Sequence, residues 1–160
     1  MQIVPLTYPA DAARVRRVFD AAADYVMLEN GHPPTDATIA EFFTDRPPTV
    51  PLENTHHLGM EMDGRLVGVA GFLFGFPDPT DCYIGLMIFD PAHRGCGLGT
   101  RTVNHIKQTA SARGATRLLI AVLDENPKGR AFWEGQGFAH LKTFAPTSDR
   151  HIRHRLGFNL

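Results

Sequence analysis

Residues 82–100 read CYIGLMIFDPAHRGCGLGT, and this stretch decides the fold. The run CYIGLMIF is apolar and predicts a buried strand, in which Gly85 indicates a bulge. The dipeptide Asp-Pro ends the strand, and a turn with glycine at 95, 97 and 99 follows at once. Apolar residues then recur at helical spacing, so the turn connects a strand to the start of a helix.

A turn of this kind is suited to binding an anion. The first amides of a helix have no partner within the helix and lie at the positive end of its dipole. Glycines permit positive φ and leave no Cβ to block a ligand, so phosphate is the expected ligand. Two common phosphate motifs do not fit. The turn lacks the lysine of a P-loop, and Ala115 and Thr116 stand where a dinucleotide-binding unit has its acidic residue.

The rest of the chain predicts a mixed sheet with flanking helices. The expected strands cover residues 2–8, 56–62, 65–76, 118–123, 138–144 and 151–158, and the expected helices cover 11–26, 35–43 and a short segment from Asn126. Asp63-Gly64 predicts a tight hairpin turn. The strand–turn–helix–strand unit over 82–123 should be the parallel part of the sheet.

The composition limits the classes of function. A length of 160 residues gives room for about one domain. A formal charge of −1 offers no electrostatic reason to expect nucleic-acid or membrane-surface binding. The first residues show no pattern of a secretory leader, and the chain has two cysteines. We therefore expect a cytoplasmic protein with free thiols that binds neither nucleic acid nor membranes.

Two motifs in order point to a family. Arg94, Gly97 and Gly99 form the pattern Arg-x-x-Gly-x-Gly, and Asn126 leads to AFWEGQGF at residues 131–138. The first resembles the pyrophosphate loop of the GNAT N-acetyltransferase superfamily, which binds acetyl-CoA. The second is similar to the same family's Asn…Ala-x-Phe-Tyr/Trp-Glu…Gly-Phe segment. The chain therefore resembles a GNAT acetyltransferase.

The resemblance covers residues 65–140 by motif and the first 60 residues by element order. It implies an α/β fold of the α+β type, with a mostly antiparallel, V-splayed sheet of about seven strands and about four helices. It also implies a single N-acetyltransferase domain over 1–160, with acceptor-side helices in about 10–45 and a cofactor-binding core in about 82–138. Acetyl-CoA would lie in the split between strands 82–89 and 118–123, and no metal is implied. The implied cofactor-binding residues are Met87, Ile88, Phe89, Arg94, Gly95, Cys96, Gly97, Leu98, Gly99, Thr100, Asn126, Arg130 and Trp133.

Acetyl transfer from a thioester needs a neutral amine, a donor to the oxyanion and a proton for the leaving thiolate. We expect the backbone amide of Met87 or Ile88 to be the oxyanion donor. Trp133 stands where the family often has a tyrosine acid, and indole is too weak an acid for that role. Tyr83 is therefore our candidate acid, unless the thiolate leaves unaided.

The sequence offers several candidates for the base that accepts the proton of the amine. The family often has a glutamate near the position of Tyr83, so its usual base is missing here. Glu61 is the candidate base, and Asp81, His56 and His57 are alternatives. The acceptor side should lie within residues 24–51, where acidic side chains would suit an amine, although exposed helix charge explains them equally. These acidic residues are Asp24, Glu29, Asp36, Glu41 and Asp45.

The function indicated is direct acetyl transfer from acetyl-CoA to an amine, with a small molecule preferred over a protein N-terminus or lysine. Two rivals stay open. One is a non-catalytic CoA-binding module of the same fold, and the other is an interaction protein whose glycine turn binds no ligand. The last two strands could also mediate a homodimer.

Overall fold

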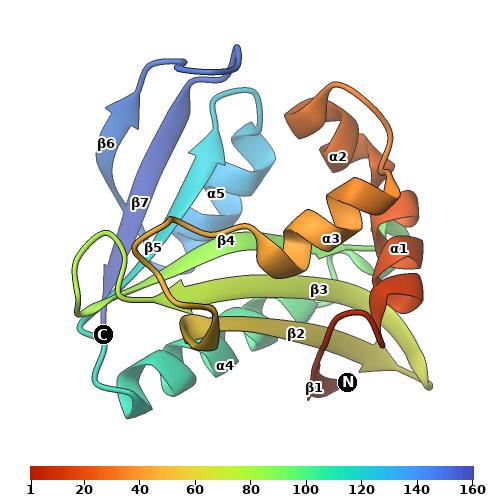
Figure 1. Ribbon diagram of the computed structural model, residues 1–160. Helices are drawn as coiled ribbons and strands as arrows, with labels where there is room; N and C mark the ends of the chain where they lie inside the picture. The colour runs from red at the N-terminus through yellow and green to blue at the C-terminus, as the bar shows by residue number, and fades with distance from the viewer.

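The computed structural model describes all 160 residues and contains one seven-stranded sheet with strand order β1-β2-β3-β4-β5-β7-β6 (Figure 1). The β4–β5 pair is parallel, and every other neighbouring pair is antiparallel. The strands are β1 Gln2–Pro5, β2 Thr55–Met62, β3 Arg65–Phe74, β4 Asp81–Phe89, β5 Arg117–Leu123, β6 Ala139–Phe144 and β7 Arg153–Asn159. The mixed, mostly antiparallel sheet expected from the sequence is confirmed.

Five α-helices flank the sheet: α1 Ala12–Ala21, α2 Ala23–Asn30, α3 Asp36–Thr44, α4 Leu98–Ala112 and α5 Pro127–Gly135. The sequence predicts about four, because its pattern reads residues 11–26 as one helix. The structure divides that segment at Ala22, which is fully buried and has φ −90° and ψ 28°. No glycine or proline marks the break, so it depends on how α1 and α2 pack rather than on local propensity.

Several local signals have the predicted effect. Asp63 and Gly64 both have positive φ, as a two-residue type I′ hairpin turn requires. Thr35 caps α3 by accepting a hydrogen bond from the amide of Thr38 at 3.2 Å. Gly114, with φ +80°, ends α4 in the left-handed conformation.

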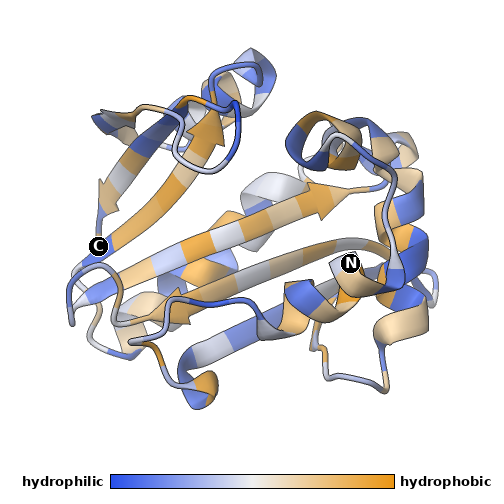
Figure 2. Cartoon of the chain, turned by 45° about the horizontal axis from the view of Figure 1, so that its top comes forward, coloured by the Kyte–Doolittle hydropathy of each residue, from blue (hydrophilic) through white to orange (hydrophobic).

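The core has two layers, one on each face of the sheet. The larger layer lies under α4 and α5 and includes Ile84, Ile106 and Leu118. The smaller lies under α1, α2 and α3 and includes Phe19 and Ile88. Hydrophobic residues are accordingly concentrated along the central strands (Figure 2). No helix is both long and apolar enough to cross a bilayer.

The sheet opens between β4 and β5. The two strands pair only where Asp81–Ile84 lies beside Arg117–Ile120, and beyond Ile84 they diverge (Figure 1). The divergence begins at a bulge in β4, because Ile84 pairs with Phe72 and Leu86 with Gly71, which leaves Gly85 without a partner on β3. The bulge predicted at Gly85 is confirmed, and it leaves the second half of β4 with one open edge.

Candidate functional site

The open edge of β4 presents backbone groups of Met87 and Phe89. The amide of Asp90 donates to the carbonyl of Val67 on β3, at 2.9 Å. Because peptide groups alternate in direction along a strand, those of Ile88 also face β3, while those of Met87 and Phe89 face the side that β5 has left. The amide of Met87 is thus the better placed of the two expected oxyanion donors. Ile88 contributes its side chain to the cleft described below.

The glycine turn leads from this edge into α4. Gly95 and Gly97 have φ of +79° and +82°, and a Cβ on either residue would meet no atom within 4 Å. Gly97 is the N-cap of α4, and no side chain caps the first amides of that helix. Thr35 caps α3 and Asn126 caps α5, whereas α1 and α2, like α4, have no side-chain cap. Open space above uncapped helix amides suits a phosphate group.

Gly99 is needed for another reason than the sequence suggests. Its φ is not positive, because it is the second residue of α4. A Cβ at this position would approach the ring of Phe132 to 2.9 Å. Gly99 therefore permits close packing of α4 against α5 rather than access for a ligand.

Arg94 connects the glycine turn to α2. Its Nη1 and Nη2 atoms donate to the two carboxylate oxygens of Asp24 on α2, at 2.6 and 2.9 Å. Its Nε donates to the carbonyl of Phe89 at 3.0 Å. The guanidinium beside Asp24 lowers the pKa of that carboxyl. All three guanidinium nitrogens are occupied, so the backbone amides of the turn are the groups free to bind phosphate.

The remaining residues of the turn divide into exposed and buried positions. Cys96 is exposed, and its thiol donates to the carbonyl of His93 at 2.9 Å. Leu98 is buried in the core under α4, so only its backbone can reach a ligand. The hydroxyl of Thr100 accepts a hydrogen bond from the side chain of Gln136, at 3.1 Å.

The second motif lies on α5, behind the split. Asn126 accepts a hydrogen bond from the amide of Gly129 at 2.9 Å and so caps the helix. Arg130 is partly exposed, and its Nε pairs with the carboxylate of Glu134 at 2.9 Å. Trp133 is buried between Phe132 and Phe138, with ring centroids 5.2 and 5.1 Å away. The side chains of Asn126 and Trp133 therefore serve the packing of α5 in this structure.

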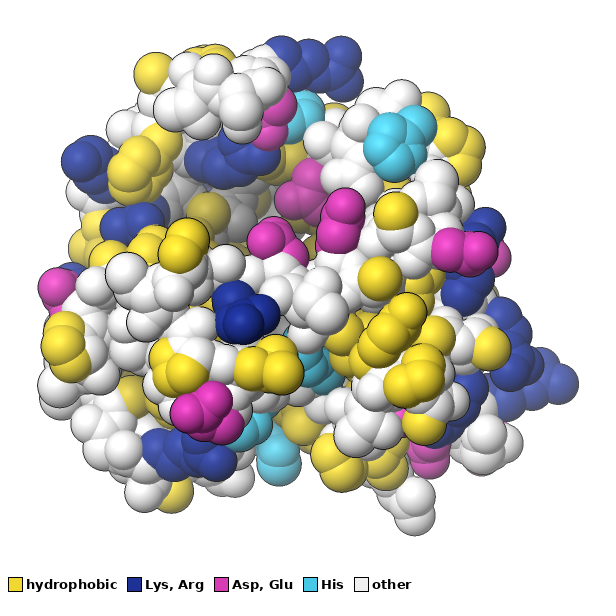
Figure 3. Space-filling model, in the orientation of Figure 1, with side chains coloured by type: hydrophobic (Ala, Val, Ile, Leu, Met, Phe, Trp, Pro, Cys, Tyr) yellow, Lys and Arg dark blue, Asp and Glu magenta, His cyan; other side chains and the backbone are white.

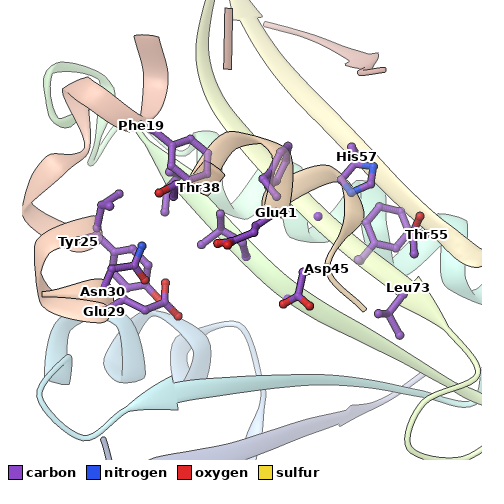
Figure 4. Close-up of a pocket in the computed structure, with 17 residues that line it drawn as sticks. Phe19, Tyr25, Glu29, Asn30, Thr38, Glu41, Asp45, Thr55, His57 and Leu73 are labelled. Atoms are coloured by element: carbon purple, nitrogen blue, oxygen red, sulfur yellow. The ribbon is translucent and has the colours of Figure 1, made fainter. Parts of the chain in front are cut away.

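A cleft of about 250 Å³ lies between α2, α3 and the open half of β4 (Figure 4). On its β4 side are Gly85, Leu86 and Ile88, next to the outward-facing amide of Met87. The helices contribute aromatic side chains, including Tyr25 of α2. The cleft and the open edge of β4 thus form one continuous candidate active site.

The polar lining of the cleft is acidic. Glu29 of α2, Glu41 of α3 and Asp45, the residue that follows α3, line it, and their carboxylates lie around the same space (Figure 4). Burial raises the pKa of Glu29, while the positive charge of Arg153 and a hydrogen bond from Tyr25 offset part of this rise. In the space-filling view, acidic side chains border a hollow at this place (Figure 3).

Tyr83, the candidate acid, lies in the paired part of β4. Its register partners are Leu73 on β3 and Leu119 on β5. The guanidinium carbon of Arg155, on β7, lies 5.8 Å from the centre of its ring. Burial raises the pKa of Tyr83, and the charge of Arg155 opposes this rise. The phenol is therefore protonated at neutral pH, as a proton donor must be.

The candidate bases are placed very differently. Glu61 lies at the far end of β2 from the cleft, and its carboxylate pairs with Arg14 on α1. Asp81 is buried and bound by Arg117 at 2.8 Å. The structure thus gives Glu61, our first candidate, a partner on α1 and no place in the cleft lining.

The two adjacent histidines lie on opposite faces of β2. His56 shares a hydrogen bond at 2.7 Å with Arg113, the residue that follows α4, and stacks on Phe72. His57 lines the cleft and packs against the aromatic rings of α3. Burial lowers the pKa of His57, so its ring is neutral at pH 7 and can accept a proton. Of the four candidate bases, only His57 lines the cleft.

Sequence reasoning missed the grouping of these side chains. It named the acidic residues of 24–51 together, but Asp24 and Asp36 pair with arginines outside the cleft. It did not identify Tyr25 or Arg155, because nothing in a single strand or helix shows which way such a side chain faces.

No group of three or more His, Cys, Asp or Glu that could hold a metal occurs in the chain.

Comparisons with known proteins agree with this geometry. The family model described as "Acetyltransferase (GNAT) family" matches residues 18–138. An acetyltransferase from Thermus thermophilus has a similar structure, with a TM-score of 0.80 and 24% identity over 99% of this chain and 96% of that one. A ribosomal-protein-alanine N-acetyltransferase from Brucella melitensis gives 0.77 and 17% over 100% of both chains. The ribosomal-protein-S18-alanine N-acetyltransferase from Escherichia coli gives 0.73 and 18% over 99% and 92%. At these identities the structures establish a shared fold.

Proposed function

Because the chain belongs to the GNAT acetyltransferase family, we propose that it transfers an acetyl group from acetyl-CoA directly to the amine of a small molecule. The observation that carries this proposal is the alignment of three features along one path. The uncapped amides of α4 lie at one end, the open edge of β4 lies in the middle, and the acidic cleft lies at the other end. A pyrophosphate, a thioester and an amine would occupy them in that order.

The proposed chemistry uses groups along this path together with Tyr83, which lies in the paired half of β4. The amine nitrogen attacks the thioester carbonyl carbon, a C–N bond forms, and the C–S bond breaks to release the thiolate of CoA. The amide of Met87 donates to the oxygen of the carbonyl as its negative charge grows. His57 takes the proton of the amine, directly or through water, and Tyr83 supplies the proton to the thiolate. No covalent bond to the protein is required.

The size of the cleft supports a small acceptor. Its volume of about 250 Å³ is near the lower end of ligand pockets, which span ~300–1,000 Å³ for drug-sized molecules. The helices that line it, α2 and α3, are joined by a short connection of residues 31–35. A folded protein surface would have to reach past these helices to bring an amine to the open edge of β4.

The test combines binding and turnover. Acetyl-CoA should raise the melting temperature, and free thiol should then be released with one class of acceptor from a panel of amines, amino acids and N-terminal peptides. A thermal shift without thiol release from any acceptor would favour the non-catalytic CoA-binding module. The absence of any shift would contradict the proposed function.

A further inference from the structure

Two exposed residues that line the cleft, Glu41 and Asp45, have carboxylates with no ion-pair or hydrogen-bond partner within the protein. Most acidic side chains of this chain form an ion pair with an arginine or histidine, but these two form none. The third carboxylate, that of Glu29, has the hydroxyl of Tyr25 beside it. Unpaired acidic groups are thus concentrated where the acceptor would bind.

No basic side chain of the cleft compensates for them. Its lining contains neither lysine nor arginine, and its one histidine, His57, has a lowered pKa because of burial. The guanidinium of Arg153, whose charge reaches Glu29, is itself bound to Asp149 at 2.6 and 2.9 Å. The carboxylates of Glu41 and Asp45 therefore have no basic side chain of the cleft lining to bind and are free to contact a ligand. Acidic side chains gathered in a cleft attract a cationic ligand.

The cleft is a binding site for reasons that do not depend on this charge. It opens onto the free edge of β4, through Gly85 and Leu86, and so lies next to the point where the thioester would be attacked. Its other walls are apolar and aromatic, with Phe19, Phe42 and Leu73 among them. An acceptor in this cleft would contact both carboxylates and an apolar surface.

The cleft has more acidic groups than an acceptor with a single amine would neutralise. The amine that reacts must be neutral at the moment of attack, so it cannot neutralise a carboxylate. Glu41 and Asp45 lie one turn apart at the end of α3, and Glu29 projects from α2 on the opposite side of the space (Figure 4). Such an arrangement matches an acceptor with a further ammonium group at a distance from the reacting nitrogen.

We propose that the acceptor is an aliphatic diamine or polyamine, whose distal ammonium binds Glu41 and Asp45 and whose methylene chain lies along Phe42 and Leu73. The same ammonium gains from the faces of the aromatic rings. This inference rests on the proposed acetyl transfer, because it assigns the cleft to the acceptor. An acceptor with a distal carboxylate would be repelled.

Three acceptors with five carbon atoms each test it: 1,5-diaminopentane, 1-aminopentane and 5-aminopentanoate. We expect kcat/KM for thiol release to favour the diamine over the monoamine by at least about tenfold, or ~1.4 kcal/mol, and to be lowest for the aminopentanoate. Equal values for diamine and monoamine would overturn the inference and leave acetyl transfer intact. No thiol release from any of these three acceptors would overturn the inference, and no release from the wider panel of amines, amino acids and peptides would overturn acetyl transfer as well.

Variants test which residues cause the preference for the diamine over the monoamine. In Glu41→Gln and Asp45→Asn, kcat/KM for the diamine should fall toward the value for the monoamine, so that most of the preference disappears. Glu53→Gln is the matched control, since Glu53 also has no ion pair but lies outside the cleft. Calorimetric titration of each variant with 1,5-diaminopentane measures the same contacts without turnover. An equal loss for both amines in Glu41→Gln, or an unchanged preference, would contradict the assignment.

Discussion

The proposed cofactor side and the proposed acceptor side of this site are built from different parts of the chain. The turn before α4 offers backbone amides, and the residues that shape it follow one another in the sequence. The acceptor cleft offers side chains from α1, α2, α3, β2, β3 and β4. A surface of consecutive backbone amides can be identified from a motif, whereas a surface of converging side chains requires the packed fold.

The largest effect is expected from a change in the glycine turn. Gly97→Glu should weaken acetyl-CoA binding by about 100-fold or more, ~2.7 kcal/mol, because it places a negative charge and a side chain in the phosphate position. Calorimetric titration with acetyl-CoA measures this. Gly114→Glu is the matched control, since Gly114 has a similar positive φ and open surroundings but ends α4 far from the turn. Equal loss of affinity in both variants would show that backbone strain, and not the turn, is responsible.

Variants of the two histidines of β2 compare the cleft face of the sheet with the opposite face. His57→Gln should lower kcat by about 100-fold, as expected for loss of a general base. Since burial lowers the pKa of His57 and only its neutral form accepts a proton, activity should fall only below the usual histidine range. That acidic limb of the pH–rate profile should be absent from His57→Gln and present in His56→Gln. A normal rate in His57→Gln would return the role of base to an acidic residue or to water.

A variant of Tyr83 tests whether the paired half of β4 takes part in catalysis. Tyr83→Phe should slow transfer by about tenfold, ~1.4 kcal/mol on the barrier, because the thiolate would leave without a proton donor. The phenyl ring keeps the packing against Phe76, so the melting temperature should change little. Steady-state thiol release at saturating substrates is the measurement. A rate equal to that of the unchanged protein would mean that the thiolate leaves unaided.

The smallest effect is expected from the ion pair between Arg94 and Asp24, which connects the glycine turn to α2. Asp24→Asn removes the carboxylate that holds Arg94, and we expect the KM for acetyl-CoA to change by less than about fivefold, since exposed ion pairs contribute ~0–1 kcal/mol. Asp20→Asn, which breaks an exposed pair with Arg16 on α1, is the control. A larger change in Asp24→Asn alone would show that this link positions the turn for catalysis.

Much of the fold could be predicted from the sequence because its signals are local. The hairpin at Asp63-Gly64 and the end of α4 at Gly114 depend on residues with positive φ, and the bulge at Gly85 is marked by a glycine within an apolar strand. The break at Ala22 could not be predicted, since three successive alanines favour a continuous helix. The break depends on contacts that α1 and α2 make with other elements.

The sequence by itself determined the glycine turn, the strand and helix on either side of it, and the family. These depend on the order of residues along one short segment, and backbone geometry there follows from neighbouring residues. Only the tertiary structure decided which side chains meet. It placed His57 in the cleft and His56 outside it, paired Glu61 with α1, and left Glu41 and Asp45 unpaired. Such groupings depend on how each helix is rotated against the sheet, and that rotation is set by packing between residues far apart in the chain.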